Sequence, residues 1–251
     1  MPRGETERRY RSYLITGFFI LAIWYLLARI LDSIALPTPL AVFFAFIAGL
    51  AEGSLISHLA ISALRVFYGL ALASSLAVPI GLVSHEEGVD KFVAPFVYLL
   101  YPIPHIVLLP LIILLFGIGD LSKIILIAII VFFQILVTTR DASRNLSINY
   151  MYSMLSLSAS KRDIYKHVIF PACVPKILTA MRISVGTSIA VLFFVESFAT
   201  RKGLGYLIMD SWSRANYPDL YATIVAMALL GFGLYIVIEK IEKRVCRWVY
   251  L

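Results

Sequence analysis

The sequence is poor in charge and in cysteine. Only 15% of its 251 residues are charged, whereas 61% are hydrophobic. A soluble domain has about 25% charged and about 45–50% apolar residues, so these proportions exclude an ordinary soluble domain. The two cysteines, Cys173 and Cys246, belong to no pairing motif. We therefore expect them to be small buried hydrophobic residues, and not a disulfide or a metal site.

Motifs for catalysis and for nucleotide binding are also absent. The sequence has no GxxxxGK(S/T) phosphate loop, no HExxH motif and no Cys/His cluster with metal-binding spacing. Gly203-Leu204-Gly205 lacks the third glycine and the preceding strand of a dinucleotide-binding site. We expect no catalytic residue, no metal and no cofactor in this chain. Energy for any uphill transport would then come from a partner or from an ion gradient.

The hydrophobic residues lie in long, continuous blocks without the alternation of barrel strands. Because lipid offers no hydrogen bonds to the backbone, such blocks cross a membrane as helices. A spanning helix needs roughly 20 mainly apolar residues. The sequence therefore predicts an all-α integral membrane protein with about six transmembrane helices, at residues 12–31, 59–83, 92–117, 120–138, 174–198 and 219–239. The third block holds Pro95, Pro102, Pro104 and Pro110, so this span should be kinked or broken.

The lysines and arginines give the orientation. With the N-terminus inside, 15 of the 22 basic residues fall in cytoplasmic segments, and only Arg201, Lys202 and Arg214 fall in outer loops. Cytoplasmic loops of membrane proteins are enriched in Lys and Arg, so both termini are predicted to be cytoplasmic. The same topology accounts for the net charge of +7, which is therefore no argument for nucleic-acid binding.

Two ridges of small residues run along the predicted second and fifth spans. Gly69, Ala73, Ala77 and Gly81 recur at every fourth position of the second, and Ala180, Ser184 and Ser188 do so in the fifth. Small side chains let a neighbouring helix approach closely, so both ridges are predicted to be packing surfaces. On the outer side, residues 38–57 are predicted to form an interfacial helix with one apolar face made of Val42, Phe43, Phe46 and Leu50.

The inner connection at 140–172 is long for a helical bundle. Apolar residues at helical spacing predict a first short helix, which Ser158-Ala159-Ser160 ends. Ser160 and Asp163 form an S-x-x-D capping signature for a second helix, which Pro171 and Pro175 should end. A solvated basic loop near lipid headgroups is one interpretation. A docking element for a cytoplasmic partner explains its apolar residues better.

Several segments together resemble one protein family. They are LPTP at 36–39, HLAISALRVFYG at 58–69, LLPLIILLFGIGDLSKI at 108–124 and ESFATRKGLGYLIMD at 196–210, with the end of the inner loop up to Pro171. In this order they are similar to the permeases of binding-protein-dependent ABC importers of the nitrate, sulfonate and taurine (NitT/TauT) type. The sequence departs from the family's cytoplasmic signature, because Tyr152-Ser153-Met154 stands at its E-A-A and Ser158 at its glycine. Ser158 can replace that glycine only if the turn avoids a positive φ.

The resemblance implies an ABC type I permease fold in the membrane of a prokaryotic cell. It divides the chain into a cytoplasmic tail with the first helix (1–35), an outer interfacial segment (36–57), a transmembrane core (58–245, with the coupling region at 140–172) and a cytoplasmic tail (246–251). It also implies four kinds of partner: cytoplasmic ABC ATPase subunits that carry ATP and Mg, an extracytoplasmic solute-binding protein, a second permease copy and membrane lipid. The implied ATPase-coupling residues are Tyr152, Ser153, Met154, Leu157, Ser158, Ala159, Ser160, Lys161 and Asp163.

By resemblance the chain would import a small, anionic solute such as nitrate, a sulfonate, taurine or bicarbonate by alternating access. An ATP-independent secondary transporter or a channel is the alternative. Charged residues inside spans usually face a bundle interior or a cavity. For Arg65 and Glu196 a structural ion pair is preferred over a substrate contact. The candidates for the translocation path are Pro102, Pro104, His105, which could equally be a packing residue, and Arg182, which could instead reach the headgroups.

Overall fold

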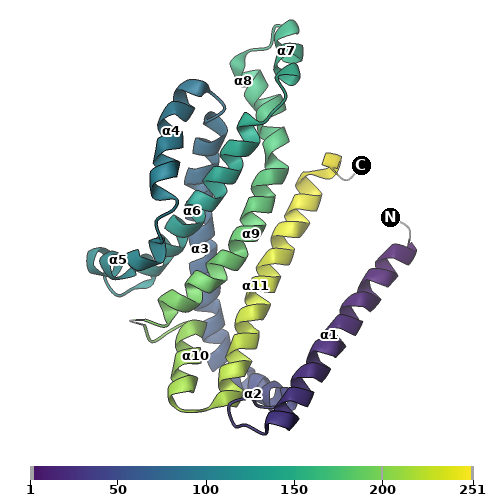
Figure 1. The fold of residues 1–251 in the computed structure, drawn as a ribbon, viewed down its shortest axis with the longest axis vertical. Helices are drawn as coiled ribbons and strands as arrows, with labels where there is room; N and C mark the ends of the chain where they lie inside the picture. Colours follow the sequence, from purple (N-terminus) through teal and green to yellow (C-terminus); the bar gives the residue numbers. More distant parts are fainter. Residues whose placement is uncertain (1–2, 199, 250–251) are drawn as a thin grey trace.

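The computed structural model describes residues 3–198 and 200–249, and every regular element among them is helical (Figure 1). The long helices are α1 (Arg3–Leu31), α3 (Ser54–Val83), α6 (Asp120–Arg144), α9 (Phe170–Glu196) and α11 (Tyr217–Val245). The shorter ones are α2 (Pro39–Ala51), α4 (Glu87–Leu100), α5 (Leu109–Phe116), α7 (Ile148–Ser156), α8 (Lys161–Ile164) and α10 (Leu204–Ser213). Single turns of 3-10 helix cover His105–Leu108 and Arg247–Val249, and a π turn covers Tyr165–Ile169.

Four helices in the described ranges are long and apolar enough to cross a membrane, with α8, the π turn and α9 counted as one helix from Lys161 to Glu196. A fifth candidate is the pair formed by α4 and the segment His105–Phe116. In α1 the apolar part, Ile15–Leu31, is shorter than these. The predicted all-helical membrane fold is therefore confirmed, whereas the count of six spans stays a prediction.

The predicted break in the third span is present. Helix α4 ends at Leu100, and the next helical segment begins at His105, at an angle of 79° to α4. Pro102 and Pro104 lie in the interval. A proline has no N–H to continue a helical ladder, and its ring clashes with the preceding turn, so two prolines in four residues favour a break over a smooth bend. The break opens one face of α6 and α9 beside it.

The core forms where α3 crosses α6, on the predicted ridge of small residues. Ala73 and Ala77 are 1% and 0% exposed. A Cβ on Gly69 would lie 2.5 Å from Cγ2 of Ile127, and one on Gly81 would lie 2.6 Å from Cβ of Thr139. These glycines are therefore needed for the close approach of α6, as expected of helix pairs in lipid, which associate through packing. The ridge of α9 is buried as well, since Ala180, Ser184 and Ser188 are at most 1% exposed.

The second half of the inner loop differs from the prediction. Pro171 and Pro175 were expected to end the helix that Ser160 begins, but the chain stays helical from Lys161 to Glu196. The π turn at Tyr165–Ile169 explains why, because its wider ladder, in which the N–H of Phe170 reaches the carbonyl of Tyr165, makes room for the ring of Pro171. Helix α8, the π turn and α9 thus form one continuous helix.

Helix α2 is shorter than the predicted helix at 38–57, because it ends at Ala51 and α3 begins at Ser54, and one residue of its predicted apolar face differs. Val42 is 3% exposed, and Phe46 and Leu50 pack against the core, but Phe43 is 57% exposed. Val42, Phe46 and Leu50 follow one another at intervals of four residues and so line one narrow face. Phe43 lies about 100° further round the helix than Val42. It contacts Phe44 edge-to-face instead, with 6.1 Å between ring centroids.

The ends of the long helices agree with the predicted topology. The first turns of α1 and the last turns of α11 point toward the end of the molecule that carries α7 and α8, whereas α2 and α10 lie at the opposite end (Figure 1). We refer to these as the inner and outer ends. That the inner end is cytoplasmic rests on the distribution of lysine and arginine, and it stays a prediction. Of the predicted tails, residues 1–2 and 250–251 lie outside the described residues.

Candidate functional site

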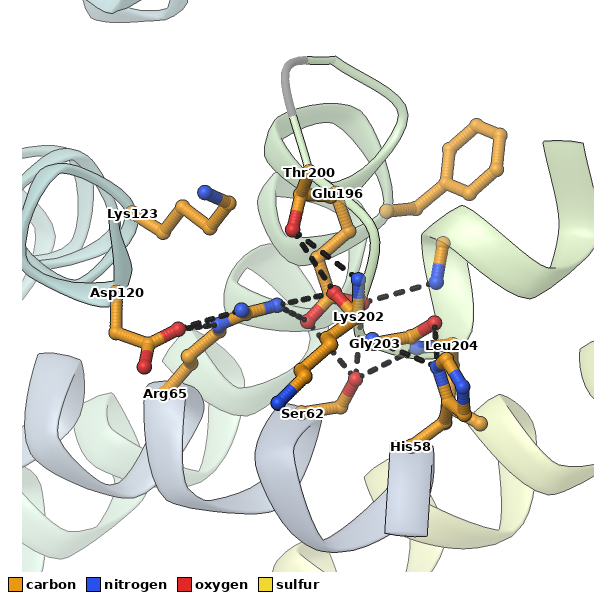
Figure 2. A network of polar contacts seen from close by, with 12 residues as sticks. His58, Ser62, Arg65, Asp120, Lys123, Glu196, Thr200, Lys202, Gly203 and Leu204 are labelled. Carbon is orange, nitrogen blue, oxygen red and sulfur yellow. Dashed lines mark hydrogen bonds and ion pairs between the residues drawn. The ribbon is translucent and has the colours of Figure 1, made fainter. Parts of the chain in front are cut away.

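A buried polar network joins α3, α6, α9, α10 and the loop before α10 at the outer end (Figure 2). Arg65 of α3 is 3% exposed, and its Nη1 donates to Oε1 of Glu196 at 2.6 Å. The structure thus brings together the two residues that were expected to pair. The Nε and Nη2 of Arg65 also donate to Oδ1 of Asp120, at 2.9 and 2.5 Å. Asp120, the first residue of α6, was missed by the sequence reasoning, because nothing local links it to position 65.

Glu196 is the centre of this network. It is 1% exposed and, besides Arg65, it accepts from the hydroxyl of Ser62 at 2.8 Å and from the N–H of Gly205 at 2.9 Å. The N–H of Leu204 in turn donates to the oxygen of Ser62 at 2.8 Å. A buried carboxylate is costly unless a charge and several donors surround it, and here they do. Glu196 therefore fastens the start of α10 to α3.

The conformation of Gly203 explains why the loop needs glycine. Its φ is +114°, and a Cβ there would lie 2.3 Å from Cδ of Glu196. Its N–H donates to Nδ1 of His58 at 2.9 Å. His58, Ser62 and Arg65 are spaced by four and three residues, so they share one face of α3. The segment H-x-x-x-S-x-x-R, noted in the sequence only as a likeness, is thus the α3 side of the network.

A cavity of about 620 Å³ opens beside this network. Its charged lining consists of Arg65, Asp120, Lys123, Arg201 and Lys202. Lys123 is 3% exposed and donates to the carbonyl of Gly119 at 2.9 Å. Four cationic side chains and one carboxylate line the cavity, so its potential should favour anions.

A second ion-pair cluster lies at the inner end. Asp90 of α4 accepts from Nε and Nη2 of Arg140 at 2.6 and 2.9 Å, and Nη1 of Arg144 lies 3.1 Å from it. Asp90 lies in the first turn of α4, and its carboxylate pairs with two arginines near the end of α6.

A central cavity of about 530 Å³ lies at the break in the third span, between α6 and α9. Of the four predicted path residues, Pro104 and His105 line it, whereas Pro102 and Arg182 do not. Arg182 instead lies 3.2 Å from Oε2 of Glu242 and 5.4 Å from the ring centroid of Tyr235, both on α11. The cavity also includes Tyr101, Gln134 and Thr187, which the sequence reasoning did not assign to a path.

The predicted coupling residues lie in an exposed helix–turn–helix at the inner end, formed by α7 and α8. Ser160 caps α8 through a capping box with Asp163, as predicted. Ser158 has a φ of +56°, so the condition stated for its replacing the family's glycine is not met. The bonds Ser158 N–H to Leu155 O and Ala159 N–H to Met154 O, at 2.9 and 3.1 Å, close the end of α7 and hold this conformation. A left-handed conformation costs a non-glycine residue about 1 kcal/mol.

Apolar side chains of this segment face away from the protein. Tyr150, Tyr152, Leu155 and Leu157 are 60%, 58%, 55% and 78% exposed. Met151 points the other way and packs against the buried cluster of Ile169, Cys173 and Ile177. The segment is therefore amphipathic. The face that carries Met151 packs against α9, and the opposite, exposed face has no partner within the described chain.

Long apolar helices, a broken span beside a cavity and an exposed apolar inner segment define the chain as a polytopic membrane transport protein. Comparison with known proteins identifies the family: the chain belongs to the binding-protein-dependent transport system inner membrane components, whose model matches residues 69–247. The predicted likeness to NitT/TauT-type importer permeases is confirmed.

Among curated relatives, the "Putative aliphatic sulfonates transport permease protein SsuC" of Bacillus subtilis is 28% identical over 98% of this chain and 90% of its own length. The taurine transport system permease protein of Escherichia coli is 27% identical over 98% of this chain and 92% of its own. Among solved structures, an inward-facing MetNI methionine ABC transporter matches with a TM-score of 0.66 at 16% identity, over 76% of this chain and 95% of that one. This last likeness concerns the fold alone.

Proposed function

We propose that this chain is the permease subunit of an ATP-driven importer in a prokaryotic cell membrane, and that it forms the path for a small anionic solute by alternating access. The observation that carries the proposal is the exposed apolar face of α7 and the turn after it, at the inner end of a chain of this family. Large exposed apolar patches mark interaction sites. Cytoplasmic ABC ATPase subunits, which would bind ATP and Mg, are the partner proposed for this face.

The coupling step follows from the continuity of α8 and α9. Closure of two ATPase subunits would move α7 and α8 as one unit. Helix α9 would move with them, because no break separates it from α8. Helix α9 lines the central cavity through Thr187 and Phe194. A displacement at the inner end therefore reaches the cavity wall, and two arrangements of the bundle can alternate in access.

The anionic solute is supported by charge and by relatives. The outer cavity is lined by Lys123, Arg201 and Lys202 as well as Arg65. The named relatives are permeases for aliphatic sulfonates and taurine, both of which carry a sulfonate group. An extracytoplasmic binding protein would deliver the solute at the outer end, beside α10. A second copy of this chain is proposed to complete the path.

The test is co-purification of the permease with candidate ABC ATPases of the same organism, followed by uptake in vesicles. Leu157→Asp places a charge on the exposed face and should abolish both co-purification and ATP-driven uptake. Trp248→Asp is the matched control, because Trp248 is also exposed, at 51%, at the end of the described chain and away from α7. A wild-type permease that binds no ATPase and moves solute without ATP would instead support the secondary-transporter or channel alternative.

A further inference from the structure

The polar side chains of the central cavity are all uncharged. They are Tyr101, His105, Gln134 and Thr187, and the remaining lining is apolar side chains and Pro104. The volume of about 530 Å³ suits a small-molecule ligand. Tyr101 and Phe194 are the aromatic side chains of the lining, and His105 stacks on Phe133, which lies outside the lining, with 4.9 Å between ring centroids.

These side chains have unused hydrogen-bonding capacity. Within the described chain, no hydrogen bond ends on the hydroxyls of Tyr101 and Thr187 or on the ring of His105. Serine and threonine in a helix commonly donate to a carbonyl of the preceding turn. Ser188, the next residue after Thr187, does so to Ser184 O at 2.7 Å. The hydroxyl of Thr187 makes no such bond and is left for the cavity.

Gln134 is oriented by a neighbour on α9. Its Oε1 accepts from the hydroxyl of Ser184 at 3.2 Å. The carbonyl end of this amide is therefore engaged, and the NH₂ end remains to donate into the cavity it lines. With the Tyr101 and Thr187 hydroxyls, three elements supply donors around one space. At membrane depth such groups persist only where water or a ligand satisfies them.

We infer that the central cavity is a neutral, donor-lined binding site for an oxyanion group, sulfonate or carboxylate, and that Gln134 and Thr187 set its specificity. This inference rests on the proposed function. Three oxygens of a sulfonate accept several hydrogen bonds. Ser184 occupies one acceptor position of the Gln134 carbonyl oxygen, and the NH₂ group of Gln134 has two donors to offer. The absence of Lys and Arg from the lining keeps binding weak, which suits a site that must release its solute.

The test measures binding of radiolabelled methanesulfonate to the permease in nanodiscs, alone and with its ATPase, without the binding protein. Gln134→Met keeps the side-chain length and Thr187→Val keeps the shape, and each removes donors. A hydrogen bond to a charged group corresponds to roughly a tenfold change in affinity, so each variant should bind about tenfold more weakly. Gln134→Glu, which adds a negative charge, should abolish binding. Ser188→Ala, on the same helix but outside the cavity lining, should bind as the wild type does.

Three results would overturn the inference. They are no saturable methanesulfonate binding by the wild type, unchanged binding by both Gln134→Met and Thr187→Val, or displacement of methanesulfonate by choline at similar concentrations. The last would show that the aromatic faces of Tyr101 and Phe194 hold cations instead. If methanesulfonate binding fails while the ATPase still co-purifies, only this inference is overturned and the proposed function stands. If the wild type associates with no ATPase, the proposed function is overturned, and the binding result can still be interpreted.

Discussion

Gly203→Ala should damage the outer network severely, for two separable reasons. At φ +114° an alanine is in a region that only glycine adopts easily, which costs about 1–3 kcal/mol. Its Cβ would also lie 2.3 Å from Cδ of Glu196, so the carboxylate must move away from Arg65. Breaking a buried ion pair costs about 3–5 kcal/mol. Together we expect a loss of at least about 4 kcal/mol, which for a chain of this size lowers the unfolding midpoint by about 8 °C or more.

Gly53→Ala separates the two causes. Gly53 also has a positive φ, +76°, but a Cβ there would meet nothing within 4 Å. It should therefore show only the backbone cost of about 1–2 kcal/mol. The assay is thermal unfolding in detergent followed with a thiol-reactive fluorophore, because Cys173 and Cys246 are both 0% exposed and react only on unfolding. Equal midpoints for the two variants would refute the reasoning that Glu196 is held rigidly against Gly203.

Two further changes test other parts of the chain. Ser158→Gly should relieve the strain at φ +56°. Hydrogen exchange of the amides at positions 158 and 159 should then become slower, by a factor that corresponds to up to about 1 kcal/mol. Faster exchange in the variant would show that the turn is not strained. Asp90→Asn should lower the free energy of unfolding by about 2 kcal/mol, because Arg140 and Arg144 lose their shared carboxylate. Asp141→Asn is the control, because the contact of Asp141 with Arg140 is 3.5 Å long and exposed, and it should change the free energy of unfolding by less than about 0.5 kcal/mol. An equal loss of stability in the two variants would contradict the role of Asp90.

Features that depend on neighbouring residues could be predicted from the sequence. The break at Pro102 and Pro104 follows from proline's missing N–H, and the capping box at Ser160 follows from a spacing of three residues. The packing ridge of Gly69 and Gly81 follows from helical periodicity. In each case the physical cause acts within one or two turns of helix, so the sequence alone contains it.

Partners chosen across the fold could not be predicted in the same way. The second carboxylate on Arg65 comes from Asp120, 55 positions away, and the partner of Arg182 comes from α11. For Arg65 and Glu196 the sequence offered two charges at the same predicted depth, which was enough to propose a pair. For Arg182 no partner was predicted, because helical periodicity does not tell which helices are neighbours.

The inner loop departs from the family signature in its side chains. Ser158 stands where the resemblance places the family's glycine, and its φ of +56° lies in the left-handed region that favours glycine. The chain accepts the strain because two backbone bonds at the end of α7 and the capping box of α8 fix the residues on both sides. At the family's glutamate stands Tyr152, which is 58% exposed beside Leu155. If this face binds an ATPase as proposed, we expect the association to depend on buried apolar area and to change little with salt.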